Sequence, residues 1–374
     1  MRTRAAIVRE PGKPWEITEL ELDEPRAKEV RIRFAYSGLC HSDEHIRTGA
    51  SVVRLPMVGG HEGSGIVEAV GEGVTRVAIG DRVVCSFIPA CGTCRYCSTG
   101  RQNLCDQGAE MLTGLLSDGT VRFHDGGEDL GGFCMLGTFA ERAVVSEASC
   151  IRLDDDIPLD VAALAGCGVP TGWGSSVYAA GVRAGQTVVI LGAGGVGSNA
   201  VQGARYAGAR HIVVVDPVPF KRESALGFGA THAFATAAEA REAVRELTWG
   251  QMADHAICTV GVLTAEVVSQ AADMVGKDAQ VTVTSVGNTG ETQVQLAANG
   301  ALVGFQRRIQ GHVFGKCNPL YDIPRLLRLY RDGQLMLDEL ITRRYSLDEV
   351  NVGYQDLDEG RIIRGLLVHD GSGE

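Results

Sequence analysis

The sequence predicts an α/β protein made of two parts, one mostly β and one built on a doubly wound parallel sheet. Two observations lead to this prediction. The first 150 residues contain short β-branched runs divided by Gly, Pro and Asp, as at 29–34, 65–70 and 82–87. From about residue 169, apolar runs alternate with helical stretches, which is the pattern of βαβ units.

In the second part, the continuous apolar run 187–191 predicts a strand buried on both faces. The elements expected after it are a helix over 197–206, a strand over 211–216, a helix over 221–229, strands over 253–260 and 280–286, a helix over 323–331 and a closing strand over 361–368. The glycine-rich stretch from about 107 to 137 has little periodicity, so a long loop is expected there. We expect one domain over 1–168 and 314–374 and another over 169–313.

Charge and hydropathy exclude several classes of protein. The chain has 374 residues with 35 basic and 46 acidic side chains, a net charge of −11, which is unfavourable for binding nucleic acid. No apolar run reaches the ~18 residues of a membrane span, and the N-terminus lacks the apolar core of a signal peptide. A cytoplasmic location is therefore expected. In that reducing compartment, the 11 cysteines are expected to be metal ligands or buried thiols.

A glycine motif follows the first apolar run of the second part. Gly192-Ala-Gly194-Gly195-Val196-Gly197 fits G-x-G-x-x-G between a predicted strand and a predicted helix, and Asp216 ends the next strand about 20 residues later. Gly192 allows a tight turn, Gly194 lets the backbone approach a pyrophosphate, and Gly197 lets helix and strand pack closely. Asp216 would bind both ribose hydroxyls and repel a 2′-phosphate, which predicts NAD over NADP. The alternative is a glycine-rich turn that binds nothing.

Four cysteines lie close together in the first part. Cys91, Cys94, Cys97 and Cys105 have the spacing C-x2-C-x2-C-x7-C, which suits a closed, structural zinc site made of thiolates alone. An iron–sulfur cluster and disulfides remain the two alternatives.

A second group of metal-ligand residues is dispersed. Cys40, His61 and Cys167 would give zinc three protein ligands and one open position, the pattern of catalytic sites. Spacing alone does not bring these three residues together. A buried cysteine and a helix-capping Ser42 remain the local alternative.

Taken together, these motifs resemble the zinc-dependent medium-chain alcohol dehydrogenases, which join a GroES-like catalytic domain to a Rossmann domain. The matching segments, in order, are Cys40-His41-Ser42-Asp43, Gly60-His61-Glu62-Gly63, the four cysteines, Gly166-Cys167-Gly168, Gly192–Gly197 and Gly360–Arg364. Four further stretches look like the actinobacterial nitrosodimethylaniline-dependent, mycofactocin-associated branch: 167–174, 199–204, 247–251 and 322–327. Members of that branch hold their nicotinamide cofactor tightly and pass electrons to a second acceptor.

The resemblance implies a role for each matching residue. Cys40, His61 and Cys167 would hold a catalytic zinc, with Glu62 as a nearby carboxylate or alternate ligand and Asp43 bonded to His61. Ser42 would start a proton relay that ends at His45 near solvent. Cofactor contacts are implied for His41, Thr171, Lys221 and Arg364, and a substrate-pocket lining for Phe87, Leu112, Leu115 and Ile309. The implied cofactors are two zinc ions per chain and NAD.

The implied activity is reversible hydride transfer between an alcohol and NAD, giving an aldehyde or ketone. Alternatives are a thiol-dependent formaldehyde dehydrogenase, a non-catalytic NAD- and zinc-binding sensor, and a ferredoxin-like electron carrier. The expected partners are a small alcohol or aldehyde, a peptide-derived redox cofactor or external electron acceptor, and other copies of the chain in a homodimer or homotetramer. No nucleic acid or membrane is expected.

Overall fold

The computed structural model describes residues 1–287, 293 and 302–369. The chain divides into two compact units, which we treat separately. Unit 1 contains Met1–Cys167 and Asn318–Glu374, and unit 2 contains Gly168–Cys317. None of the helices in the described part of the chain combines the length and apolar character of a membrane span.

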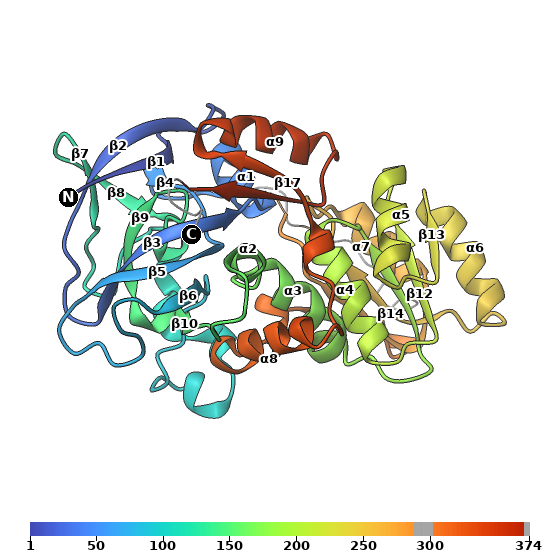
Figure 1. Ribbon diagram of the computed structural model, residues 1–374. Helices are drawn as coiled ribbons and strands as arrows, with labels where there is room; N and C mark the ends of the chain where they lie inside the picture. The colour runs from blue at the N-terminus through green and yellow to red at the C-terminus, as the bar shows by residue number, and fades with distance from the viewer. Residues whose placement is uncertain (288–292, 294–301, 370–374) are drawn as a thin grey trace. The chain divides into compact units, whose positions relative to one another are not determined.

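Unit 1 is mostly β. Five short strands close a barrel in the order β1-β2-β7-β8-β4, and the remaining strands form a sheet in the order β10-β6-β5-β3-β18-β17, with β9 also paired to β3 (Figure 1). The strands are β1 (Arg2–Val8), β2 (Glu16–Leu22), β3 (Glu29–Gly38), β4 (Met57–Val58), β5 (Gly63–Val70), β6 (Arg82–Cys85), β7 (Phe123–Asp125), β8 (Glu128–Gly132), β9 (Arg142–Ser146), β10 (Cys150–Arg152), β17 (Ile341–Ser346) and β18 (Arg364–Val368).

The helices of unit 1 are few and short. They are α1 (His41–Thr48), α2 (Leu159–Leu164), α8 (Pro319–Arg331) and α9 (Val350–Asp358), with 3₁₀ turns η1 (Cys97–Thr99), η2 (Gln102–Leu104), η3 (Asp106–Glu110), η4 (Phe133–Met135), η5 (Glu147–Ser149), η9 (Asp338–Leu340) and η10 (Leu347–Glu349). A further 3₁₀ turn, η8 (Phe314–Lys316), belongs to unit 2. Because few helices cover the sheets, the core of unit 1 is supplied by alternate strand residues such as Ile32 and Phe34 of β3.

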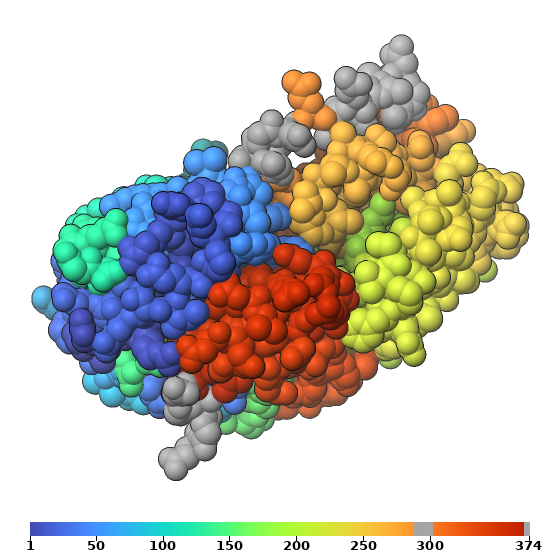
Figure 2. Space-filling model, turned by 90° about the horizontal axis from the view of Figure 1, so that it is seen from above, coloured from blue at the N-terminus to red at the C-terminus, as the bar shows by residue number. Residues whose placement is uncertain are grey.

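The C-terminal segment of the chain completes the sheet of unit 1. β18 pairs with β3 in antiparallel fashion, and the Trp15 N–H donates to the Asn351 side chain of α9 over 2.8 Å. Figure 2 accordingly shows the C-terminal segment, in red, packed against the N-terminal segment, in blue. Residues near both ends of the chain therefore build one unit.

The prediction of a continuous loop over 107–137 is wrong. β7 and β8 lie within it and form a hairpin in the barrel, turning at Gly126 and Gly127, which both have positive φ. Phe123 and Leu130 face each other across this hairpin, and both side chains are buried. One apolar side chain on each short strand is enough to anchor the hairpin, but it is too little to produce a visible alternation in the sequence.

Unit 2 is an open sheet of six parallel strands in the order β13-β12-β11-β14-β15-β16. Its elements are α3 (Gly168–Gly174), the π-helical η6 (Ser175–Ala180), β11 (Thr187–Leu191), α4 (Gly195–Tyr206), β12 (His211–Val215), α5 (Pro219–Phe228), β13 (His232–Phe234), α6 (Ala237–Leu247), β14 (Ala253–Cys258), α7 (Ala265–Asp273), β15 (Val275–Val283) and β16 (Arg308–Gly311). β11 coincides with the predicted run 187–191, and all five of its residues are buried.

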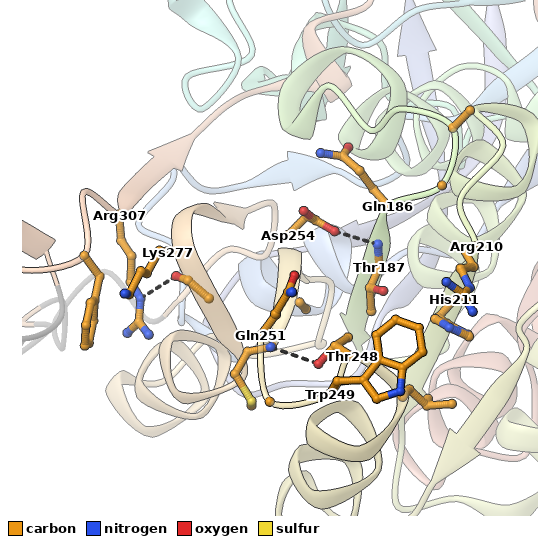
Figure 3. A pocket seen from close by; sticks show the side chains of 18 residues that line it. Gln186, Thr187, Arg210, His211, Thr248, Trp249, Gln251, Asp254, Lys277 and Arg307 are labelled. Atoms are coloured by element: carbon orange, nitrogen blue, oxygen red, sulfur yellow. Dashed lines mark hydrogen bonds between the residues drawn. The ribbon is translucent and has the colours of Figure 1, made fainter.

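The two edges of this sheet differ. After β11 the chain builds β12 and β13 on one side, then crosses to build β14, β15 and β16 on the other, so the strand order reverses at β11. Ligands of such sheets bind outside the carboxyl ends of the strands at this reversal. At the other end of the strands, their amino ends, lies a pocket of about 820 Å³ (Figure 3). Its lining includes Arg210, Trp249 and Lys277, and within it the Thr187 N–H donates to Asp254.

Candidate active site

Four of the predicted metal ligands lie together in unit 1. One ligand atom from each of Cys40, His61, Glu62 and Cys167 lies within 4.8 Å of all the others. The four side chains are buried, with residue exposures of 8%, 2%, 0% and 7%. We call this group the mixed cluster.

Local backbone geometry brings these residues together. Cys40 follows β3 and is the N-cap of α1, His61 and Glu62 connect β4 to β5, and Cys167 follows α2. Gly60, before His61, has φ +87°, and a Cβ there would lie 2.5 Å from the backbone nitrogen of Phe139. A Cβ on Gly166 would lie 2.4 Å from the Cys85 carbonyl oxygen. The glycines beside His61 and Cys167 are therefore required by close packing.

The donor chemistry of the mixed cluster fits zinc. Two thiols and an imidazole in a buried site are the N and S ligands that zinc prefers. A hydrogen bond from Cys167 and the nearby His61 hold the pKa of Cys40 well below its usual value, so Cys40 is favoured as the thiolate. The hydrogen bond to Cys40 and burial raise the pKa of Cys167, and a cation at the cluster would offset that effect.

Asp43 fixes the orientation of His61. Asp43 Oδ1 lies 3.1 Å from His61 Nδ1 and accepts the Gly60 N–H over 2.9 Å. This bond leaves Nε2 of His61 for the cluster, as in carboxylate–histidine–metal arrangements. Burial opposes the charged imidazole, but the negative charges of Asp43 and Cys40 outweigh it and raise the pKa of His61.

Glu62 is held by an arginine from the far end of the chain. The Arg364 guanidinium donates a short hydrogen bond to Glu62, and both side chains are buried. Burial raises the pKa of Glu62 to about 7, while the charge of Arg364 acts in the opposite direction. Gly38 makes room for the pair, because a Cβ there would lie 2.3 Å from Glu62 Oε2. The family resemblance implied a cofactor contact for Arg364. The structure shows that Arg364 also contacts the mixed cluster, which the sequence did not indicate.

Two aromatic rings flank the imidazole of His61. Phe87 and Phe133 pack edge to face against it, with centroid separations of 5.8 and 5.2 Å. Phe87 is one of the predicted pocket residues, but Phe133 was missed. It lies in η4, where Cys134 and Met135 have left-handed φ of 54° and 60°. Backbone strain at two consecutive non-glycine residues is typical of functional sites, but it leaves no mark on the sequence.

Ser42 and His45 both lie on α1. Ser42 Oγ is 3.7 Å from Cys40 Sγ, at the side of the mixed cluster. His45 is only 6% exposed, which differs from the expectation of a histidine near solvent, because α1 buries residues 43–46 on its inner face. Within the described residues, His45 Nε2 is buried without a hydrogen-bond partner. His41 is the first residue of α1.

The four cysteines at 91–105 form a second group in unit 1, which we call the four-cysteine cluster. Their sulfur atoms lie within 4.8 Å of one another, and the group contains no imidazole or carboxylate ligand. Backbone N–H groups of Thr93, Cys94 and Cys97 donate to sulfurs over 3.3–3.4 Å. Burial opposes the Cys91 thiolate, but the N–H donors of Cys94 and Thr93 outweigh it and lower its pKa to about 6. Four thiols without an open position suit a structural zinc.

The glycine motif lies at the carboxyl edge of unit 2. Gly192 has φ +96°, and a Cβ on Gly197 would lie 1.9 Å from the Gly192 carbonyl oxygen. A Cβ on Gly194 would meet nothing within 4 Å, so a ligand could approach the backbone there. Gly195 and Val196 begin α4, whose N-terminus faces this open space and suits a pyrophosphate.

Asp216 lies next to the glycine motif. Its carboxylate accepts the Ala193 N–H over 2.8 Å and the Val218 N–H over 2.9 Å, and Arg222 donates to its carbonyl oxygen. Lys221 is half-buried on α5. Thr171 lies on α3, and its hydroxyl is a buried group without a partner in the described part of the chain.

Comparison with known proteins identifies the class. The family model of the alcohol dehydrogenase GroES-like domain matches residues 26–155, and that of the zinc-binding dehydrogenase matches residues 195–332. The chain belongs to the zinc-dependent medium-chain alcohol dehydrogenase family. This confirms the family, the enzyme class and the fold class predicted from the sequence.

Individual relatives cover the whole chain. It is 57% identical to the NDMA-dependent alcohol dehydrogenase of Amycolatopsis methanolica, over 99% of each chain. Among solved structures, it is similar to an alcohol dehydrogenase zinc-binding domain protein from Burkholderia ambifaria, with a TM-score of 0.91, 34% identity and coverage of 98% and 99%. It is also similar to benzyl alcohol dehydrogenase from Acinetobacter calcoaceticus, with a TM-score of 0.91, 30% identity and 99% coverage of each chain.

Proposed function

We propose that the protein is an alcohol dehydrogenase that interconverts an alcohol and the corresponding aldehyde or ketone, with NAD as hydride acceptor. The observation that carries the proposal is the buried mixed cluster of Cys40, His61, Glu62 and Cys167. Zinc held by Cys40, His61 and Cys167 would act as a Lewis acid that makes the alcohol a stronger acid. Bound NAD would accept the hydride from the α-carbon.

The residues around the mixed cluster have separate tasks. Asp43 holds the His61 imidazole in the tautomer that leaves Nε2 free for the cluster. Arg364 neutralises Glu62, so this carboxylate stays available as an alternate ligand without adding net charge. Phe87 and Phe133 exclude water beside His61 and favour a substrate with an apolar chain.

Oxidation releases one proton from the alcohol in addition to the hydride, and we assign its removal to residues of α1. The Ser42 hydroxyl at the side of the cluster accepts the proton first, the ribose of bound NAD passes it on, and the buried imidazole of His45 receives it last. The neighbouring His41 is assigned to the cofactor pyrophosphate. Since an imidazole titrates, it is a weaker cation there than arginine would be.

Each unit has its own role in this proposal. Residues 1–168 and 314–374 form the catalytic domain, and residues 169–313 bind NAD through Gly192, Gly194, Gly195, Val196 and Gly197. Asp216 binds the adenosine ribose and disfavours NADP, Lys221 contacts the same ribose, and Thr171 braces the nicotinamide ring. The four-cysteine cluster holds a second, structural zinc.

We further propose that NAD stays bound between turnovers and that electrons leave through an external acceptor. The support is the 57% identity to a relative described as NDMA-dependent. A peptide-derived redox cofactor of the mycofactocin type would be the natural acceptor, and the chain would work as a homodimer or homotetramer in the cytoplasm.

The test is a turnover assay on purified protein with a panel of primary and secondary alcohols and nitrosodimethylaniline as acceptor. Metal analysis and nucleotide extraction of the same sample should give two zinc ions and one nicotinamide per chain. Turnover of formaldehyde only in the presence of a free thiol would instead favour the formaldehyde dehydrogenase. Bound zinc and nucleotide without turnover of any alcohol would favour the sensor.

A further inference from the structure

The pocket at the amino ends of the strands in unit 2 has no role in the function proposed above, and we call it the amino-end pocket. It lies where β11, β14 and β15 begin and has a volume of about 820 Å³. A volume of this size is typical of sites for small molecules. The glycine motif follows the other end of β11, so the amino-end pocket is separate from the predicted cofactor site.

Part of the wall of this pocket comes from 247–251, one of the stretches in which the sequence resembles a particular branch of the family. The Thr248 hydroxyl holds a turn there, because it donates to the Val244 carbonyl oxygen over 2.6 Å and accepts the Met252 N–H over 2.9 Å. Trp249 and Met252 have left-handed φ of 51° and 67°. Such backbone is costly for large side chains and is concentrated at functional sites, so the turn that carries Trp249 is a candidate binding element.

Trp249 is exposed, whereas the other two tryptophans are buried. Its exposed fraction is 79%, against 2% for Trp15 and 0% for Trp173. The Arg210 guanidinium lies over the indole, 5.5 Å from the ring centroid. An arginine stacked in this way keeps the N–H groups at its edge available to an anion, and the exposed indole can stack with a second flat ring.

The charged groups of the amino-end pocket favour an anion. Arg210, Lys277 and Arg307 line it, and Asp254 is the one carboxylate among its described lining residues. Asp254 already accepts the Thr187 N–H over 2.8 Å, and Arg307 donates to three backbone carbonyl oxygens. Within the part of the chain that the structure describes, Arg210 and Lys277 form no ion pair, so both charges are available to a ligand.

A histidine beside Arg210 adds a polar group without a partner. Figure 3 shows Arg210, His211 and Trp249 together at one side of the pocket and Lys277 at the other. Burial and the charge of Arg210 lower the pKa of His211, so its ring is neutral near pH 7. Its Nε2 is buried and has no hydrogen-bond partner among the described residues. Buried polar atoms normally have a partner, and a ligand in the pocket would supply one.

We propose that the amino-end pocket binds a small aromatic anion, a molecule with one flat ring and a carboxylate or phosphate group. The ring stacks on Trp249, and the acidic group accepts hydrogen bonds from Arg210. Lys277 adds positive charge from the opposite side of the pocket. The inference does not depend on the proposed function, because it uses only residues of unit 2 at the end of the strands away from the glycine motif.

The test uses the emission of Trp249 as a reporter inside the pocket. Since Trp15 and Trp173 are buried, emission from solvent-exposed indole comes from Trp249. The protein as purified is titrated with benzoate, with phenyl phosphate and with benzamide, an uncharged analogue of benzoate. We expect the better of the two anions to quench this emission with about tenfold tighter binding than benzamide, the equivalent of one charge-assisted hydrogen bond. The difference between benzoate and phenyl phosphate identifies the acidic group.

Two substitutions separate the acidic group from the ring. We expect Arg210→Gln to weaken binding of the anions about tenfold and to leave benzamide within about twofold, because only the anions use the guanidinium. Trp249→Phe should remove the emission change, while calorimetry should still detect the anion, since phenylalanine keeps a ring for stacking.

Arg245→Gln is the matched control. Arg245 lies on α6, directly before the stretch 247–251, so this substitution removes the same charge close to the amino-end pocket. The Arg245 guanidinium is paired with Glu242 over 2.8 Å and is not part of the lining. We expect the affinities for benzoate, phenyl phosphate and benzamide to stay unchanged.

The inference is overturned by any of three results. If both anions bind no more tightly than benzamide, or if none of the three compounds quenches Trp249, the pocket does not select an aromatic anion. If Arg210→Gln leaves the affinity for the anions unchanged, they bind elsewhere on the protein. If Arg245→Gln weakens the anions as much as Arg210→Gln does, the attraction comes from net charge and not from a defined site.

Discussion

The mixed cluster and the four-cysteine cluster each bring four ligand atoms within 4.8 Å of one another, but they are built in different ways. The four-cysteine cluster comes from one short stretch of chain, and backbone N–H groups of its own turns surround the sulfurs. Two of its cysteines are half-buried and two are buried. The mixed cluster is fully buried and collects its ligands from three distant segments.

The difference lies mainly in what surrounds the ligands. Turn amides stabilise thiolates directly, so the four-cysteine cluster needs few other residues to hold it. In the mixed cluster, His61 is oriented by Asp43 and Glu62 is paired with Arg364, and these side chains come from other parts of unit 1. Changes in such partner side chains can adjust the reactivity of the mixed cluster. The four-cysteine cluster is held by its own turns, so it can only bind its zinc or lose it.

The largest effect is expected from Cys167→Ser in the mixed cluster. We expect turnover to fall at least about a thousandfold, because loss of Lewis-acid assistance removes several kcal/mol of transition-state stabilisation. Zinc content should fall from two to one per chain while the thermal midpoint changes little. Turnover within tenfold of the unaltered enzyme would contradict the catalytic assignment.

Cys97→Ser in the four-cysteine cluster should lower the thermal stability and leave turnover almost unchanged. We expect the thermal midpoint to fall by about 10 °C, because structural zinc contributes directly to folding free energy. Protein that remains folded should turn over within about twofold of the unaltered rate. A scanning calorimetry trace that does not change, together with a large loss of turnover, would mean that the two clusters have exchanged roles.

Asp43→Asn tests whether surrounding side chains tune the mixed cluster alone. We expect about 10- to 100-fold weaker zinc binding there, because His61 loses the carboxylate that fixes its tautomer. Competition with a chromogenic chelator should show one zinc released early and one unaffected. If both zinc ions were released together, the clusters would not be independent.

The smallest effect is expected from Asp118, a carboxylate outside both clusters. It distinguishes unfolding of the protein by acid from release of zinc by acid. Burial would raise the pKa of Asp118, but hydrogen bonds from Thr120 and Arg122 outweigh it and hold the pKa well below its usual value. A pKa that is lower in the folded state adds stability above about pH 4, and that stability is lost as the pH falls further.

Asp118→Asn should therefore cost about 0.5 kcal/mol in unfolding free energy at pH 7, since the side chain is 36% exposed and screened by solvent. The difference from the unaltered protein should shrink progressively as the pH falls below about 4, as measured by urea unfolding at each pH. The pH at which zinc is released should stay the same. A difference that grows on acidification would show that the sign of the pKa shift is wrong.

Features that depend on neighbouring residues in the chain could be predicted from the sequence. The run 187–191 is a buried strand because both faces of a parallel sheet are covered, and Gly192–Gly197 makes its turn because Gly197 packs on the Gly192 carbonyl oxygen. The cysteine spacing likewise predicted a group that local turns hold together.

Features that depend on distant residues could not be predicted in the same way. No local pattern links Glu62 to Arg364, because the pair forms only when β18 joins β3. Phe133 was missed because it reaches His61 from an irregular turn. For the mixed cluster, the spacing of the ligands in the sequence did not predict that they meet. The family resemblance did.

The pairing of β18 with β3 affects the order in which a working enzyme can be made. All four ligands of the mixed cluster are synthesised by residue 167, but the arginine that neutralises Glu62 follows almost 200 residues later. Until the ribosome has released that last strand, Glu62 lacks its ion pair with Arg364, and Tyr36, Ser37 and Gly38 of β3 lack their pairing with β18. A nascent chain that stops before β18 thus holds all four ligands of the mixed cluster but lacks the arginine that neutralises Glu62.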